Sequence, residues 1–386
     1  MWLDDFRPLV AGAPSPGVGL SEDAFMPFGI EAADLAGTTY PVRETVHAHL
    51  PFAVLRGFTM VEAPQERILL VPPLAGGHPF LMRDLVSALL PVCGAVAVAD
   101  WPNARYVPKA SGRFGLAENI AEVAQMIRAL GPRVHVVGVC QGAVPALAAA
   151  ALLAEDGEAP LSLSLLGGPI EPSRAPTNLL RTLRERCIPA MEQQVVEKVP
   201  VIFPGMGRKV FPARRQAQAF GLYLWRQAMT GGELPTRLLF DEGADPARFP
   251  LAKLCWTMMD VPGELFIENL AALADDALAR GTLAVEGHPV RPSALAATVL
   301  LTVEGSVDDI AAPGQTEAAH DLCSGLPPEL HRRATIAGSG HFGLFYGRRM
   351  REEVVPAIAA AIAASAGLAG APASEAAIVP VRSIAP

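Results

Sequence analysis

The amino-acid sequence predicts an α/β protein with a mostly parallel sheet, helices on both sheet faces, and a mainly helical cap inserted after a central strand. Short runs rich in Val, Ile and Leu alternate with helical patterns, which is typical of buried parallel strands joined by helices. This alternation stops between residues 168 and 287. Hydrophobic residues make up 51% of the 386 residues and charged residues 18%, so the chain has ample material for a large core.

Each core element is predicted from its own pattern. Apolar runs of strand length cover residues 67–72, 95–100, 134–139, 161–167, 297–305 and, more weakly, 334–340. Helical patterns cover residues 79–90, 116–130, 142–155 and 351–364. The expected organisation is a weakly patterned N-terminal extension (1–60), an α/β core (61–167 and 288–365), a cap insertion (168–287) and a flexible tail (366–386).

Composition excludes several classes of function. The chain has 39 acidic and 31 basic residues and a net charge of −8, which argues against nucleic-acid binding. Apolar runs such as residues 144–154 are shorter than the ~18 to 20 residues that span a bilayer. The start, "MWLDDFRPLV", has acids where a secretion signal needs basic residues. We therefore expect a cytoplasmic protein.

The chain has five cysteines, at positions 93, 140, 187, 255 and 323. They form no C-x-x-C pair, which disfavours both a disulfide framework and a zinc site.

The pentapeptide "GVCQG" (138–142) joins a predicted strand to a predicted helix. It has the G-x-S-x-G pattern of a nucleophile elbow, with Cys140 in place of the serine. Such a turn raises the central side chain above the sheet edge, and the following helix N-terminus favours a thiolate. The alternative is a buried structural cysteine, which is a common role for this residue. The pentapeptide by itself is compatible with both.

The rest of the chain supplies the partners that a cysteine nucleophile needs, a histidine base and an acid that orients it. On a sheet of this kind their chain order is nucleophile, acid, histidine. The strand ending in "TVEG" is followed by Asp308 and Asp309, and "AGSGHFG" supplies His341 after the last strand. We favour Asp308 because it lies three residues past Gly305. Asp309 could instead be a solvated loop acid or a helix cap, and His341 an ordinary loop histidine.

An oxyanion hole needs two backbone N–H groups directed at the developing charge. One is expected from Gln141, directly after the candidate nucleophile. The other is expected from the loop "PPLAGGHPF", where Pro72 and Pro73 lack an N–H. Leu74 is the first donor available there, and Ala75 is the next. This chemistry requires neither a metal nor a cofactor.

Several motifs together resemble the intracellular polyhydroxybutyrate (polyhydroxyalkanoate) depolymerases, from about residue 61 to residue 358. They are "VPPLAGGH", "DWPNARYVP", "VGVCQGAVPALAA", "LLGGPIEP", "PGMGRKVFP", "GHPVRP", "TVEGSVDDI", "GQTEAAHDLC" and "GHFGLFYGRRMREEVVP". The resemblance implies an α/β-hydrolase fold, a cysteine nucleophile and hydrolysis of stored 3-hydroxyalkanoate polyester at granule surfaces. Its triad falls on Cys140, Asp308 and His341. The first 60 residues and residues 237–266 depart from the family.

The predicted reaction is therefore polyester hydrolysis. Cys140 attacks the ester carbonyl, His341 takes the thiol proton and returns it to the leaving hydroxyl, and Asp308 orients His341. The alternatives are a polyhydroxyalkanoate synthase-like acyltransferase, an esterase for short soluble esters, and a non-catalytic granule-associated protein.

Two further expectations concern the cap. A thiolytic depolymerase would pass the acyl group to coenzyme A, whose phosphates could bind the basic cluster of Arg208, Lys209, Arg214 and Arg215. Phe220 or Trp225 is expected near the mouth of the site, either against the polymer or in a small core of the cap.

Overall fold

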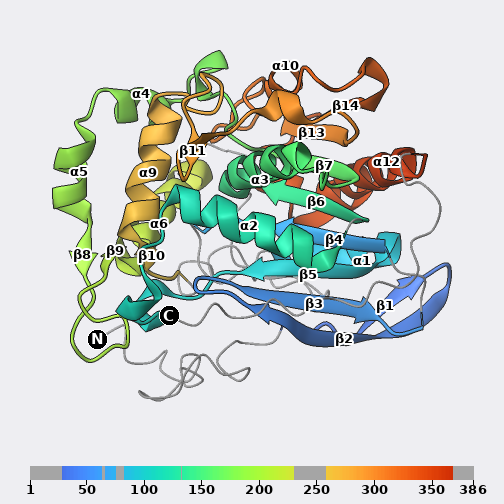
Figure 1. Cartoon of the computed structure of the whole chain (residues 1–386), viewed down its shortest axis with the longest axis horizontal. Coiled ribbons are helices and arrows are strands. Elements are labelled where there is room, and N and C mark those ends of the chain that lie inside the picture. The colour runs from blue at the N-terminus through green and yellow to red at the C-terminus, as the bar shows by residue number, and fades with distance from the viewer. Residues whose placement is uncertain (1–27, 63–65, 75–81, 132, 230–257, 368–386) are drawn as a thin grey trace.

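The computed structural model describes residues 28–62, 66–74, 82–131, 133–229 and 258–367 (Figure 1). Its main feature is a nine-stranded sheet with the order β1-β2-β3-β5-β4-β6-β7-β13-β14. The strands are β1 (Ala32–Leu35), β2 (Thr38–His49), β3 (Val54–Met60), β4 (Glu66–Val71), β5 (Gly94–Asp100), β6 (Val134–Val139), β7 (Ser162–Leu166), β13 (Val299–Gly305) and β14 (His331–Ile336). Neighbouring strands from β5 to β14 are parallel, as predicted.

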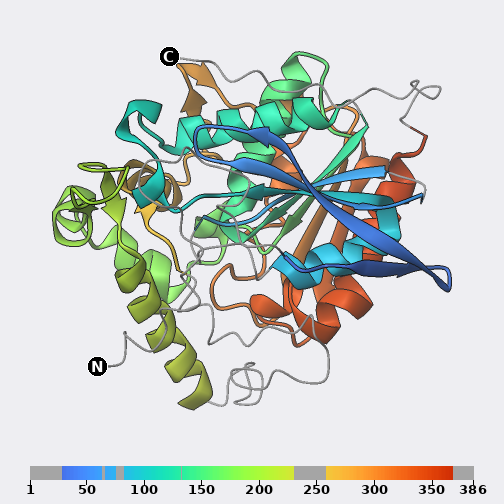
Figure 2. The ribbon, with the colours of Figure 1, turned by 90° about the horizontal axis from the view of Figure 1, so that it is seen from below.

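Helices cover both faces of this sheet, so its central strands are buried and read as continuous apolar runs. Figure 2 shows α2 (Leu116–Leu130) and α3 (Ala143–Glu155) on one face, and α1 (Arg83–Cys93) and α12 (Val355–Ser365) on the other. Helix α2 has the bounds predicted from its periodicity, because its apolar side chains recur three and four residues apart and are buried. A short α11 (Gly347–Arg349) and a π-helical turn (Met350–Val354) precede α12, and α10 (Ala319–Leu322) lies between β13 and β14.

The sheet begins earlier than the sequence suggested. Residues 1–60 were expected to lie outside the core, but β1, β2 and β3 extend the sheet by antiparallel pairing, and β3 pairs directly with β5. The reason is that an antiparallel strand with one solvated face carries polar residues at alternate positions, as β2 does. Its pattern is therefore weaker than that of the buried parallel strands. Residues 1–27 lie outside the described residues.

We propose that residues 168–287, between β7 and β13, form a cap over the carboxyl ends of the parallel strands (Figure 1). The described part is mainly helical. Its helices are α4 (Asn178–Arg184), α5 (Ile188–Val195), α6 (Ala213–Met229) and α9 (Gly263–Ala274). Its short strands are β8 (Glu197–Lys198), β9 (Lys209–Phe211) and β10 (Val261–Pro262) in one sheet, and β11 (Ala284–Val285), which pairs with β12 (His288–Pro289) just after the cap. Among the described helices, none combines the length and apolarity needed to cross a bilayer.

Candidate active site

Cys140 lies at a sharp turn between β6 and α3. Its φ is +52°, a left-handed conformation that is uncommon for a residue with a side chain and that often marks a functional site. The flanking glycines permit the turn. A Cβ on Gly138 would lie 2.8 Å from the Ala143 Cα, and one on Gly142 would lie 2.2 Å from the Val71 carbonyl oxygen. Residues 138–142 thus have the strand–turn–helix geometry expected of a nucleophile elbow.

The structure brings Cys140, His341 and Asp308 together. His341 Nδ1 donates to Asp308 Oδ2 over 2.7 Å, and Cys140 lies near enough to the His341 ring to interact with it electrostatically. His341 and Asp308 are buried, whereas Cys140 is half-buried. Nucleophilic acyl transfer requires this spatial arrangement, in which an accessible thiol lies beside a buried imidazole and the imidazole lies beside a buried carboxylate.

The carboxylate of Asp308 is fixed by the backbone around it. Its Oδ1 accepts hydrogen bonds from the N–H groups of Ile310 (2.8 Å) and Ala311 (2.9 Å), which leaves Oδ2 directed at His341. The Asp308 N–H itself donates to the Gly305 carbonyl over 3.1 Å, so a tight turn at the end of β13 sets the direction of the side chain. This turn explains why an acid three residues after Gly305 reaches the histidine.

The loops that carry the acid and the histidine are joined along their backbones. The Ser306 N–H donates to the Ile336 carbonyl and the Val307 N–H to the Ser339 carbonyl, both over 3.1 Å. A Cβ on Gly305 would lie 2.3 Å from the Ser339 carbonyl oxygen, so no other residue fits this contact. The close approach holds Asp308 and His341 in a fixed relation even though 33 residues separate them in the chain.

The electrostatics of the site favour a charged histidine. Burial lowers the pKa of the His341 imidazole, but the negative charges of Cys140 and Asp308 outweigh it, as do the hydrogen bonds to both side chains. The pKa of His341 is therefore raised well above its ordinary value. A proton held on His341 is available for transfer to a leaving group at this site.

Other cysteines differ from Cys140 in their surroundings. Burial raises the pKa of Cys93 and of Cys323 to about 12, so these two thiols stay protonated and serve as packing groups. Cys187 is exposed at the start of α5. Cys255 lies outside the described residues. Of the described cysteines, Cys140 is the one whose side chain interacts with His341.

Two other buried histidines have structural partners. Buried His135 joins Ser162 (2.9 Å) to Glu66 (2.7 Å) within the sheet. Buried His320 contacts Thr302 (2.9 Å) and His331 (2.7 Å). His78 lies outside the described residues.

The two residues expected to form the oxyanion hole lie in adjacent segments. Gln141 follows Cys140 in the elbow, and Leu74 lies in the loop after β4, the strand that pairs with β6. The start of this loop is fixed by Trp101, whose indole N–H donates to the Pro72 carbonyl over 3.1 Å. Ala75 lies outside the described residues. The assignment of the Gln141 and Leu74 N–H groups stays a proposal.

The cap contacts the loops that carry Asp308 and His341, which was not predicted from the sequence. Tyr223 of α6 donates through its hydroxyl to Asp309 Oδ1 over 3.0 Å. The Phe342 ring, next to His341, packs edge-on against Phe220 and tilted against Tyr223, with centroids 5.7 and 6.2 Å apart. Asp309 thus faces the cap while Asp308 faces His341. Phe220 was expected near the site, but no sequence signal indicated its partner or the contacts of Tyr223, because aromatic residues in a helix have many alternative partners.

We predict that Gly167→Ala slows ester hydrolysis, whereas its loss of stability is no larger than that of a control glycine variant. Gly167, at the end of β7, has φ +54°, and an added Cβ would lie 3.3 Å from both Cε1 and Nδ1 of His341. Gly157→Ala is a matched control, because Gly157 has φ +76° and nothing lies within 4 Å of its would-be Cβ. Both changes should cost about 1–2 kcal/mol of unfolding free energy through backbone strain.

The two variants should differ in ester hydrolysis. The alanine at position 167 displaces the imidazole, so kcat should fall at least ~10-fold, whereas the variant at position 157 should keep the wild-type kcat. Equal kcat values for the two variants would show that Gly167 does not position His341.

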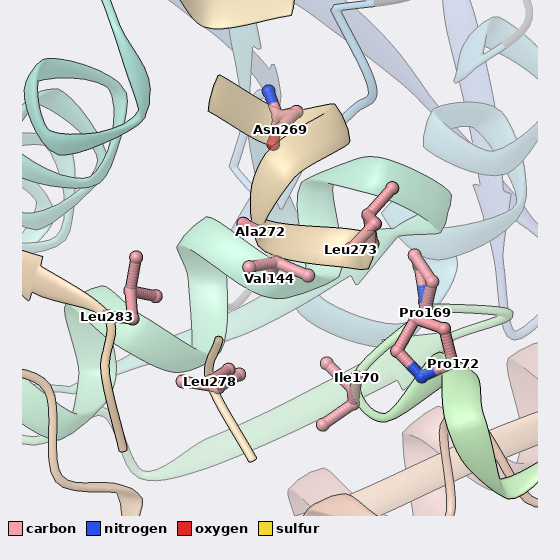
Figure 3. Close-up of a pocket in the computed structure, with 9 residues that line it drawn as sticks. All are labelled: Val144, Pro169, Ile170, Pro172, Asn269, Ala272, Leu273, Leu278 and Leu283. Atoms are coloured by element: carbon pink, nitrogen blue, oxygen red, sulfur yellow. The ribbon is translucent and has the colours of Figure 1, made fainter. Parts of the chain in front are cut away.

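A small apolar pocket, with a cavity volume of about 10 Å³, lies beside the elbow helix, between the first turn of α3, the segment after β7 and α9 (Figure 3). Val144, Pro169, Ile170, Pro172, Asn269, Ala272, Leu273, Leu278 and Leu283 line it. The Asn269 side chain donates to the Leu265 carbonyl within α9. The lining contains no titratable group, so this pocket serves the packing of the cap on α3, and the reacting groups lie outside it.

Comparison with protein families gives one match to most of the second half of the chain. The family model described as "PHB de-polymerase C-terminus" matches residues 167–366, more than half of the chain. This range includes the cap, Asp308 and His341, but not Cys140. None of the curated proteins matches this chain.

Several solved structures with low sequence identity are similar to this chain, and the first of them, with a TM-score above 0.5, shows the fold. A lipase in its open form has a TM-score of 0.51 at 16% identity, over 84% of this chain and 99% of its own. A malate-bound thermophilic esterase from Thermogutta terrifontis (TM-score 0.49, 13% identity) covers 84% of this chain and 98% of its own. Epoxide Hydrolase A from Mycobacterium thermoresistibile (TM-score 0.47, 15% identity) covers 83% of this chain and 98% of its own. The chain has the α/β-hydrolase fold, as predicted.

Proposed function

Because the chain belongs to the PHB depolymerase family, we propose that it hydrolyses the ester bonds of intracellular poly(3-hydroxyalkanoate), using Cys140, His341 and Asp308 as its triad. Family membership makes the protein a carboxylic ester hydrolase. The observation that supports the triad most strongly is the His341–Asp308 hydrogen bond beside Cys140, which itself lies at a left-handed turn.

In the proposed first step, the Cys140 thiolate attacks the ester carbonyl carbon. The oxyanion that forms accepts hydrogen bonds from the Gln141 and Leu74 N–H groups. As the C–O bond breaks, the His341 imidazolium gives its proton to the leaving alkoxide, which departs as a hydroxyl. The product on the enzyme is a thioester at Cys140, and Asp308 keeps the imidazole oriented through both proton transfers.

In the proposed second step, water attacks the thioester carbonyl and His341 takes one of its protons. The C–S bond breaks, the 3-hydroxy acid or oligomer leaves, and the Cys140 thiolate and His341 imidazolium are restored. This sequence needs neither a metal nor a cofactor.

The surroundings of the basic cluster favour water over coenzyme A as the acceptor. Buried Arg208 donates to the carbonyls of Val107 (3.3 Å), Pro108 (2.6 Å) and Gly112 (2.8 Å). The other three cations pair with acids: Lys209 with Glu192, and Arg214 and Arg215 with Glu197. These pairings give the four residues structural roles in the cap and its contact with the core.

Soluble product analysis tests this function. Purified protein is incubated with amorphous poly(3-hydroxybutyrate) particles, with and without coenzyme A. We expect free 3-hydroxybutyrate or its oligomers at a rate that coenzyme A does not change. Release of 3-hydroxyacyl-coenzyme A would establish thiolysis instead. Formation of insoluble polymer from 3-hydroxyacyl-coenzyme A would identify a synthase, and turnover of short esters with untouched particles would identify a soluble esterase.

The proposed setting is the surface of storage granules in the cytoplasm. The polymer is insoluble and cannot diffuse into a closed site, so a triad at the carboxyl edge of the sheet has to be brought to it. A non-catalytic coat protein would also bind granules, but it would release no hydroxy acid from them.

A further inference from the structure

The large hydrophobic side chains that the described residues expose gather on the cap and beside the catalytic acid. Most belong to the loop between β8 and β9 or to α6. They are Val201 (78% exposed), Ile202 (71%), Met206 (52%), Leu222 (65%), Trp225 (62%) and Val307 (58%). The first five lie in the cap, and Val307 directly precedes Asp308. Val201, Ile202 and Met206 fall within six residues of one loop, and neighbouring exposed apolar side chains often mark a contact surface.

We propose that the loop from Val201 to Met206, termed here the docking loop, binds the surface of the polyester. The proposal rests on the proposed function and identifies how that substrate is met. Figure 2 shows the docking loop and α6 on the same side of the molecule, at the cap. The inner aromatic residues of α6, Phe220 and Tyr223, contact Phe342 next to His341, so α6 connects the cap with the candidate active site.

The docking loop is held rigidly by its inner residues. The Gly205 N–H donates to the Arg105 carbonyl over 2.9 Å, and the Gly207 N–H donates to the Val199 carbonyl over 2.9 Å. A Cβ on Gly205 would lie 2.8 Å from the Arg105 carbonyl oxygen, so the loop sits directly on the turn that follows β5.

An aromatic contact adds to this anchoring. The Arg105 guanidinium lies 4.9 Å from the centre of the Phe203 ring, which also packs edge-on against Tyr106 at 5.7 Å. Phe203 is therefore an anchor that points inward, while Val201, Ile202 and Met206 point outward. Apolar groups on an anchored loop lose little conformational freedom on binding, which favours docking to a surface.

The chemistry of the exposed side chains indicates what they bind. Val201, Ile202 and Met206 carry no charge and no hydrogen-bond donor, and Met206 offers only a weak thioether acceptor. An interface with another protein typically includes Tyr, Trp or Arg as anchors. An uncharged aliphatic polyester offers carbonyl oxygens and methyl groups but no charge, and it matches three aliphatic side chains. The overall charge of −8 does not oppose binding to a neutral surface.

The test compares two double variants of the docking loop. Val201→Ser with Ile202→Ser removes the apolar surface, while Val201→Ile with Ile202→Val keeps it and serves as the matched control. Both positions are largely exposed, so neither variant should change the fold. Binding is measured by co-sedimentation with protein-free amorphous poly(3-hydroxybutyrate) particles and with phosphatidylcholine vesicles. Hydrolysis is measured on the particles and on a short soluble 3-hydroxybutyrate ester.

We expect the serine variant to bind particles at least ~10-fold more weakly and to cleave them correspondingly more slowly, with its soluble-ester rate within about twofold of wild type. The control variant should behave as wild type. If the serine variant binds and cleaves particles normally, the docking loop has no such role. Loop-dependent binding to vesicles but not to particles would also overturn the proposal. Failure of the wild type to release hydroxy acid from particles would instead contradict the proposed function.

Discussion

Replacing Cys140 by alanine should lower ester hydrolysis at least ~10³-fold while leaving the fold intact, because the members of a catalytic triad act as a unit. The thiol is half-buried at the surface of the elbow, so its removal opens no cavity in the core. The kcat on a soluble 3-hydroxybutyrate ester measures the effect, and thermal unfolding checks the fold. Cys140→Ser should retain little activity, since a hydroxyl differs from a thiol in acidity and size.

Cys187 provides the matched control for this prediction. It is a free cysteine in the cap, exposed to solvent, and Cys187→Ala should keep the wild-type rate. A Cys140→Ala enzyme that hydrolyses esters at a near-wild-type rate would remove Cys140 from the mechanism. That result would support the alternative that Cys140 is a structural cysteine, which is also compatible with the pentapeptide.

Asp308→Asn should reduce kcat by at least ~10²-fold, since a comparable change in a serine protease triad costs ~10⁴-fold. Asparagine has one acceptor oxygen, which the Ile310 and Ala311 N–H groups would hold, so its NH2 group would face His341 Nδ1 and could not accept a hydrogen bond from it. The substitution also removes one of the charges that raise the pKa of His341. His341 must be protonated to release the leaving group, so activity falls as pH rises through its pKa. This upper limb of the pH–rate profile should therefore shift to lower pH in Asp308→Asn.

Asp309→Asn is the matched control for Asp308→Asn. Asp309 accepts a hydrogen bond from the Tyr223 hydroxyl, and an asparagine oxygen can accept the same bond. The rate and the pH–rate profile of Asp309→Asn should stay near those of the wild type. If this variant were the damaged one and Asp308→Asn the normal one, our assignment of the acid would be wrong by one residue.

The parallel core could be predicted from the sequence because its strands are covered on both faces. The run at residues 134–139 is apolar except for His135 and becomes β6, and the periodicity of residues 116–130 becomes α2 with the same bounds. The antiparallel strands were missed for a local reason. β3 contains Gly57, where a Cβ would lie 1.9 Å from His47 Nε2. The glycine makes room for the side chain of β2 and at the same time weakens the strand pattern.

The candidate site could be predicted in part. The spacing from Gly305 favoured Asp308, and the structure shows the hydrogen-bonded turn that directs its side chain to His341. The sequence could not show that Asp309 turns to Tyr223, because that contact joins residues 86 positions apart. The cap was the hardest part to predict. Its strands β8 and β10 have two residues each, too few to show a period of two.

The most direct test of the central claim, that Cys140 is the nucleophile, is the location of the acyl group during turnover. An activated 3-hydroxybutyrate ester with a good leaving group makes release of the acyl group the slower step, so the acyl-enzyme accumulates. The reaction is quenched in acid within milliseconds to seconds, the protein is digested, and the peptides are analysed by mass spectrometry. The account predicts a burst of about one leaving group per active site and a hydroxybutyryl group on the peptide that contains Cys140. A burst with the acyl group on any other residue would contradict it.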